Sequence, residues 1–111
     1  MRRTSDPFEA QRSNATSELA RSVLDVVDAI PRGRVMSYGD IAAHLGCGPR
    51  QVARVMTERG DEAAWWRVLR SDGTCAPEVR VQQMRRLRAE GVAMRGDARV
   101  DMKVARYVVE E

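Results

Sequence analysis

The chain has 111 residues, a net charge of +3 and 43% hydrophobic residues, values that fit one domain of a soluble globular protein. No stretch approaches the roughly 20 apolar residues of a membrane helix, and no apolar run of a signal peptide follows the basic start at Met1. Two cysteines and one histidine, spaced unlike zinc ligands, exclude a disulfide framework and predict no metal and no cofactor. We therefore expect a cytoplasmic protein with no membrane partner.

The basic residues are almost all arginines, since Lys103 is the only lysine among 19. Arginine binds phosphate through two parallel hydrogen bonds and stacks on bases, so this bias suits a nucleic-acid partner. A genome rich in G and C would produce the same bias, and composition alone leaves both explanations open. The positions of the arginines must decide between them.

The first predicted element is a helix from Thr16 to Ile30, which Pro31 ends. Apolar residues recur in it at helical spacing, namely Leu19, Val23, Val26, Val27 and Ile30. Residues 1–15 are polar and include a possible short helix start at Asp6 and Pro7. We expect residues 1–15 to form a mobile N-terminal arm and residues 16–111 to form the domain.

Two short helices joined by a glycine-containing turn are predicted next, which is the helix-turn-helix pattern. Ser37 is expected to cap the first helix, over residues 38–45, with Asp40 completing a capping box. Gly46 ends that helix, and the second runs over residues 49–59, beginning at a proline.

The run Trp65–Arg70 is aromatic and β-branched, and the turn signal Ser71–Thr74 comes directly after it. Residues 77–90 are predicted to form a helix with inward apolar residues at Val81, Met84 and Leu87.

Residues 92–94 and 99–102 are expected to pair across Gly96 as a short β-hairpin. The predicted fold class is α+β and mostly helical, in a single domain that combines the helix-turn-helix with this hairpin.

Four segments in unbroken order over residues 19–94 resemble the DNA-binding domain of the O6-alkylguanine-DNA alkyltransferases. Ile30–Ala42 reads IPRGRVMSYGDIA, against IPxGxVxSYGxIA in that family. Arg50-Gln51-Val52, with Met56 after it, resembles the recognition helix with its arginine finger. Arg67-Val68 with Asp72-Gly73 resembles the end of the active-site motif PCHRV and the segment after it, and Leu87–Val92 resembles the closing L..EGV element. The resemblance implies the winged-helix-like fold of the alkyltransferase C-terminal domain.

The active-site motif itself differs, because Ala64-Trp65-Trp66-Arg67 stands where the enzymes have Pro-Cys-His-Arg. An indole supplies neither the nucleophile nor the general base that the chemistry needs. Glu90 remains where the enzymes have the carboxylate that orients the histidine, but it is expected to have nothing to orient. A tryptophan in place of this cysteine is typical of the alkyltransferase-like proteins, so we expect no enzyme and no catalytic residue. Cys75 is interpreted as a bystander, since no histidine lies near it in sequence.

The resemblance implies a DNA damage sensor that binds O6-alkylguanine in duplex DNA from the minor groove, flips the base and signals to nucleotide excision repair proteins. It implies a monomer associated with the nucleoid. The implied DNA-binding residues are Ser37, Tyr38, Arg50, Gln51 and Arg54, and the implied alkylguanine pocket consists of Tyr38, Trp65, Val68 and Leu69. Arg50 is favoured as the finger, with Arg54 as its competitor because the match needs a short gap there. Trp66 is expected in the core.

Two other functions stay open. A helix-turn-helix regulator would read sequence in the major groove as a dimer without recognising a lesion, but it has no reason to carry the WWRV and LRAEGV elements. An active alkyltransferase would need an unexpected nucleophile.

Overall fold

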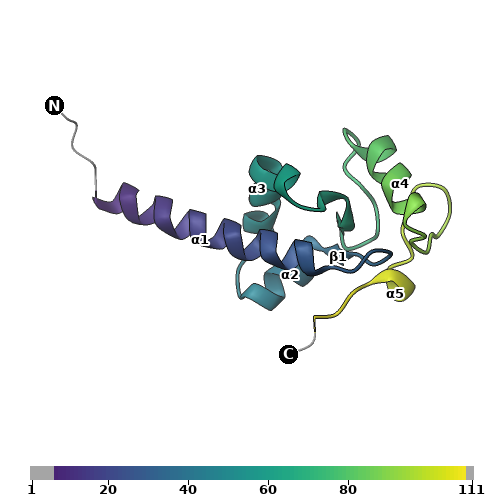
Figure 1. The fold of residues 1–111 in the computed structure, drawn as a ribbon, viewed down its shortest axis with the longest axis horizontal. Coiled ribbons are helices and arrows are strands. Elements are labelled where there is room, and N and C mark those ends of the chain that lie inside the picture. The colour runs from purple at the N-terminus through teal and green to yellow at the C-terminus, as the bar shows by residue number, and fades with distance from the viewer. Residues whose placement is uncertain (1–6, 110–111) are drawn as a thin grey trace.

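The computed structural model describes residues 7–109, with side chains described from residue 18 onward. The helices are α1 (Pro7–Ala29), α2 (Tyr38–Leu45), α3 (Pro49–Arg59), α4 (Arg80–Ala89) and α5 (Met102–Ala105). Two 3-10 turns, η1 (Gly60–Glu62) and η2 (Trp65–Arg67), and two strands, β1 (Met36–Ser37) and β2 (Val68–Leu69), lie between them. Helices α1, α2 and α3 pack on one another, and α4 and α5 lie toward the end of the molecule away from the N-terminus (Figure 1). The predicted class, mostly helical with a small sheet, is confirmed.

Helices α2 and α3 have the predicted bounds because their end signals are local. The Ser37 Oγ accepts a hydrogen bond from the Asp40 amide, and the Asp40 carboxylate accepts one from the Ser37 amide, both at 3.0 Å. Gly46 closes α2 in the left-handed conformation, at φ +74°. At the start of α3 the Gln51 Oε1 accepts a hydrogen bond of 2.8 Å from the Gly48 amide. The chain therefore turns tightly from α2 into α3.

Helix α1 is longer than predicted, because it begins at Pro7 instead of Thr16. Proline is favoured in the first turn of a helix, and the polar residues after it offer no apolar periodicity that would have revealed the helix. Residues 7–15 of the expected arm are thus helical, and residues 1–6 lie outside the described residues. The division into a mobile arm and a domain stays a prediction. Among the residues that the structure describes, no helix combines the length and apolar character that crossing a membrane requires.

The two-stranded sheet is parallel, with Met36 opposite Val68 and Ser37 opposite Leu69. The run predicted at Trp65–Arg70 is divided, since both tryptophans lie in the 3-10 turn η2 and only Val68 and Leu69 are extended. The C-terminal segment joins beside β1, where the Val35 carbonyl accepts a hydrogen bond of 2.7 Å from the Tyr107 amide.

This sheet separates two apolar clusters. The first cluster joins α1, α2 and α3, and Met36 and Val68 belong to it. The second cluster gathers residues around α4 and the C-terminal part of the chain, namely Val35, Leu69, Cys75, Met84, Leu87, Val92, Val100 and Ala105. Successive strand residues point to opposite faces of a sheet, so Val68 and Leu69 lie in different clusters although they are neighbours in sequence.

The hairpin predicted over residues 92–102 is present only as an antiparallel bridge between Met94 and Val100. Helix α4 begins at Arg80, later than the predicted residue 77, and its inward face is rotated. Val81, expected to be inward, is 73% exposed, while Gln83 is buried. The Gln83 side chain is tolerated there because its Nε2 donates hydrogen bonds to the carbonyls of Trp66 at 3.0 Å and Val68 at 2.8 Å.

Candidate functional site

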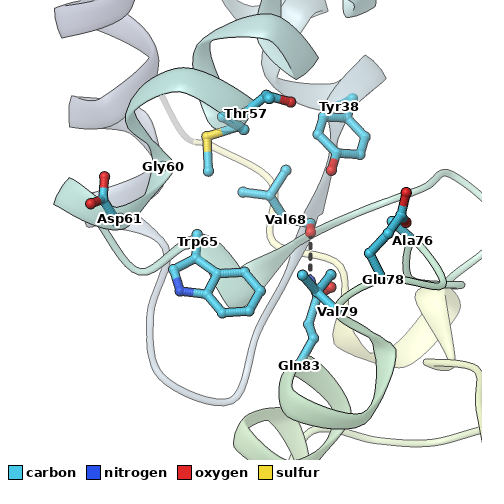
Figure 2. Close-up of a pocket in the computed structure, with 11 residues that line it drawn as sticks. Tyr38, Thr57, Gly60, Asp61, Trp65, Val68, Ala76, Glu78, Val79 and Gln83 are labelled. Atoms are coloured by element: carbon cyan, nitrogen blue, oxygen red, sulfur yellow. Dashed lines mark hydrogen bonds between the residues drawn. The ribbon is translucent and has the colours of Figure 1, made fainter.

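A cavity of about 440 Å³ lies between the end of α3, the η2 turn and the segment that leads into α4. Its lining consists of Tyr38, Met56, Thr57, Gly60, Asp61, Trp65, Val68, Ala76, Glu78, Val79 and Gln83. Figure 2 shows Trp65 on one side, Tyr38 on the other and Val68 between them. The volume falls in the range of roughly 300–1,000 Å³ that is typical of pockets for small molecules. A flat aromatic guest such as a nucleobase fits a site walled in this way.

The wall at Trp65 depends on how closely the end of α3 approaches it. A Cβ atom at Gly60 would lie 3.3 Å from the Met56 Cε and 3.5 Å from the Trp65 Cβ, so the glycine leaves room for both side chains. The Trp65 ring meets the Trp66 ring edge to face, at 6.1 Å between centroids and 86° between planes. Trp65 therefore presents a supported aromatic surface to the cavity.

Tyr38 brings a phenol to the opposite wall from the first residue of α2. Burial raises the pKa of Tyr38, and the positive charge of Arg70 opposes this effect only in part. The hydroxyl group therefore stays protonated at neutral pH and can donate a hydrogen bond to a guest.

Three of the four residues predicted to form the pocket, Tyr38, Trp65 and Val68, line this cavity. The fourth, Leu69, was wrongly assigned: it is 1% exposed and packs in the second cluster, on the other face of the sheet. Strand alternation requires this separation once Val68 faces the cavity. Sequence reasoning missed the contributions of Thr57, Asp61 and the segment before α4, for which no motif gives a signal.

Ser37 was predicted to contact DNA, and the structure buries its side chain. It is 2% exposed, and its hydroxyl oxygen accepts the capping hydrogen bond from Asp40. A buried side chain committed to a helix cap has no surface to offer a phosphate. Its contribution to the site is to fix the start of α2 and with it the position of Tyr38.

The three other predicted DNA-binding residues are exposed on α3 but differ in their partners. The Arg54 Nε donates a hydrogen bond of 3.2 Å to Glu58, and the Gln51 side chain is bound to the Gly48 amide. Within residues 18–109 the guanidinium group of Arg50 has no hydrogen-bond or ion-pair partner. Seven residues separate Arg50 from Thr57, so the two lie on one side of α3, and this side leads to the cavity.

A polar cluster stands behind the cavity wall, centred on Glu90. Its carboxylate accepts hydrogen bonds from the Trp66 Nε1 at 2.8 Å and from the Arg67 Nε and Nη2 at 3.0 and 2.8 Å. The Arg67 Nη1 also donates to the Ile30 carbonyl at 2.9 Å, and the Arg86 guanidinium lies 4.4 Å from the Trp66 ring centroid. The expectation that Glu90 has nothing to orient is therefore wrong, because it binds the indole of Trp66.

Glu90 remains ionised within this cluster. Burial by itself would raise the pKa of this carboxyl group, but the hydrogen bonds from Arg67 and Trp66, together with the charge of Arg67, outweigh burial and lower its pKa. Trp66, expected in the core, packs against the second cluster and is partly buried. It thus combines a core contact with a hydrogen bond to an ionised group.

Cys75 lies close to the cavity without lining it. Burial raises the pKa of the Cys75 thiol, and the charges of Arg70 and Arg80 oppose this only in part. A protonated, buried thiol is a poor nucleophile, which agrees with the interpretation of Cys75 as a bystander.

Comparison with known proteins gives concordant matches. Residues 18–92, well over half of the chain, match the family described as 6-O-methylguanine DNA methyltransferase, DNA binding domain. A methylated-DNA–protein-cysteine methyltransferase of Methanothermobacter thermautotrophicus is 36% identical over 85 residues, which cover 72% of this chain and 48% of that protein. The chain thus spans about half the length of this relative. A DNA base-flipping protein of Escherichia coli is 30% identical over 106 residues, covering 89% of this chain and 81% of that protein.

Two solved structures share the fold. S. pombe Atl1 in complex with damaged DNA containing O6-carboxymethylguanine superposes with a TM-score of 0.73 and 29% identity. S. pombe ATL in complex with DNA gives a TM-score of 0.70 at the same identity. Both matches cover 82% of this chain and 95% of the other. The chain therefore belongs to the family of the 6-O-methylguanine DNA methyltransferase DNA-binding domain, within which it is an alkyltransferase-like protein.

Proposed function

We propose that the protein is a non-enzymatic sensor that binds duplex DNA from the minor groove and flips an O6-alkylguanine base into the cavity. The main support for this proposal is the cavity walled by Trp65 and Tyr38, whose lining includes Thr57, on the same side of α3 as Arg50. S. pombe Atl1, whose fold this chain shares, was solved with DNA that contains such a lesion. An altered base pair opens at lower free-energy cost than an intact one, which favours extrusion of the lesion.

Each part of the site has a role in this scheme. Trp65 offers a stacking surface to the flipped base, and the protonated hydroxyl of Tyr38 donates a hydrogen bond to it or to the adjacent backbone. Arg50, which has no partner within residues 18–109, enters the duplex and occupies the space that the base leaves. Arg54 and Gln51 hold the α3 surface against the phosphates.

The sensor transfers no alkyl group. Trp65 and Trp66 occupy the positions of the nucleophile and the base, and none of the eleven residues that line the cavity is a cysteine or a histidine. One relative, from Methanothermobacter thermautotrophicus, is named as a methyltransferase. The absence of alkyl transfer by this protein therefore requires its own test. Incubation with DNA carrying a labelled O6-methyl group should leave all label on the DNA. Stoichiometric label on the protein, at Cys75 or elsewhere, would contradict the assignment.

Recognition itself is tested by gel shift with two duplexes that differ only by O6-methylation of one guanine. The methylated duplex should bind more tightly. Equal affinity for the two duplexes, together with a preference for one DNA sequence and a dimeric complex, would favour a helix-turn-helix regulator.

The bound monomer signals the lesion to nucleotide excision repair and acts at the nucleoid. A bound protein and an extruded base distort the duplex far more than a methyl group alone, so the complex offers a larger target to repair proteins. Excision by a reconstituted nucleotide excision repair system should be faster on the methylated duplex when the protein is added. An unchanged excision rate, with lesion binding intact, would remove this part of the proposal.

A further inference from the structure

The charge of the cavity lining has a consequence for the lesion that the cavity accepts. Asp61, in η1, and Glu78, in the segment before α4, are its only ionisable side chains besides Tyr38, and none of the eleven lining residues is basic. Figure 2 shows the two acidic residues on opposite sides of the cavity, Asp61 beyond Trp65 and Glu78 beside Val79. Both side chains are exposed, so they place two negative charges at the edges of the cavity and not deep inside it.

These two charges are not neutralised by nearby residues. Within residues 18–109, neither Asp61 nor Glu78 has an ion-pair or hydrogen-bond partner through its side chain. The neighbouring Glu62 shows the contrast, because its carboxylate is paired with Arg59 at 2.8 Å. The basic group that acts on the cavity wall is Arg70, whose charge acts on Tyr38 but which does not itself line the cavity.

We infer that the cavity selects O6-alkylguanines by charge, accepting neutral and cationic alkyl groups and disfavouring anionic ones. The inference rests on the proposed function and specifies its substrate class. Two like charges about 4 Å apart in water repel by an amount equivalent to roughly fivefold in affinity, and exposed carboxylates act on a guest through water at this strength or less. Two carboxylates with no basic residue on the lining leave an anionic group without compensation.

The O6-carboxymethyl group is the natural probe, because S. pombe Atl1 was solved with that lesion and the group is anionic at neutral pH. Its neutral counterpart of nearly the same shape is the O6-carbamoylmethyl group, and the O6-(2-aminoethyl) group supplies a cation. Affinities are measured for duplexes that carry these groups, O6-methylguanine or plain guanine at one position. We expect the carbamoylmethyl duplex to bind more tightly than the carboxymethyl duplex, by up to about fivefold for each carboxylate. The aminoethyl duplex should bind at least as tightly as the carbamoylmethyl duplex.

Substitutions of Asp61 and Glu78 test whether these two side chains cause the preference for uncharged alkyl groups. Glu78→Gln and Asp61→Asn should each reduce the carbamoylmethyl-to-carboxymethyl affinity ratio, and the double variant should bring it close to one. Asp28→Asn, on the exposed surface of α1, is the matched control, since it changes the net charge equally without touching the cavity. It should raise the affinity for all duplexes alike and leave the ratio unchanged.

The outcomes separate this inference from the function on which it rests. Equal binding of O6-methylguanine and guanine duplexes would overturn the proposed function. Intact preference for O6-methylguanine, combined with equal binding of the carboxymethyl and carbamoylmethyl duplexes, would overturn only the charge selection and would indicate that Arg70 reaches the anion. A ratio that stays large in the double variant would also overturn it.

Discussion

The two adjacent tryptophans, Trp65 and Trp66, have opposite environments. Trp65 faces the cavity, and within residues 18–109 its indole N–H has no protein acceptor. Trp66 donates its N–H to Glu90, lies under Arg86 and packs against the second cluster. One side chain is available to a guest, whereas the other is fully engaged by the protein. Residue type alone therefore says nothing about which tryptophan belongs to the site.

The backbone conformation explains this difference. Both residues lie in the 3-10 turn η2, in which successive side chains point about 120° apart because each turn takes 3.0 residues. If one indole faces the cavity, the next must face elsewhere, and here it meets Glu90. Trp65 thus forms a wall of the cavity, and Trp66 is part of the scaffold behind it.

The largest expected effect is a loss of stability when the hydrogen-bonded cluster around Glu90 is broken. Glu90→Ala should lower the free energy of unfolding by about 3–5 kcal/mol, because it leaves Arg67 as an unpaired, mostly buried charge and removes the acceptor of Trp66. Urea denaturation measures the change. Glu58→Ala breaks an exposed ion pair with Arg54 and should cost no more than about 1 kcal/mol. Similar losses in the two variants would show that the Glu90 cluster is not a major part of the scaffold.

Substituting each tryptophan separately tests the contrast between them directly. Trp65→Ala should reduce the affinity for an O6-methylguanine duplex by roughly 1–3 kcal/mol, the scale of one base–aromatic stacking contact. Trp66→Phe should keep lesion preference but lower stability by about 1–3 kcal/mol, since Glu90 loses a donor. Fluorescence anisotropy and urea denaturation report the two quantities. If Trp66→Phe abolished lesion preference while Trp65→Ala retained it, the roles would be reversed.

Arg50 and Arg54 show a similar contrast on the proposed DNA-binding surface. Arg54 is hydrogen-bonded to Glu58, whereas Arg50 has no partner within residues 18–109. Arg50→Ala should selectively weaken lesion binding by roughly 1–3 kcal/mol and reduce extrusion of a fluorescent guanine analogue. Arg54→Ala should weaken binding to all duplexes and lower the salt slope by about 1, as expected for a phosphate contact. Loss of discrimination in Arg54→Ala, with equal weakening of lesion and control DNA in Arg50→Ala, would exchange these assignments.

A dependence of stability on pH is the weakest effect that we expect. The pKa of Glu90 is below its ordinary value of 4.5, so its contribution to stability is present above that value and is lost as the pH falls through the folded-state pKa. Glu90→Gln should therefore flatten the loss of stability below pH 4.5. Glu62→Gln is the control, because Glu62 also has a lowered pKa but lies exposed beside Arg59. An unchanged acid slope in Glu90→Gln would show that another carboxylate dominates.

Helices whose end signals are local could be predicted from the amino-acid sequence. Ser37, Asp40 and Gly46 act within a few residues of one another, so the bounds of α2 could be derived from them without knowledge of the rest of the fold. The family motifs around Tyr38 and Trp65 together placed three residues on the cavity wall, because a family motif records which positions meet in space.

Features that depend on contacts between distant segments became visible only in the folded structure. The face of α4 that is buried depends on the two backbone carbonyls to which Gln83 donates hydrogen bonds. Gln83 is therefore buried and Val81 is exposed, although the apolar pattern of the sequence predicted that Val81 faces inward. The hydrogen bond from Trp66 to Glu90 joins residues 24 positions apart, and the cavity brings Asp61 to the same space as Glu78. Residue type sets what a side chain can do, but packing between segments sets which atoms it meets, and charge selection in the cavity depends on the latter.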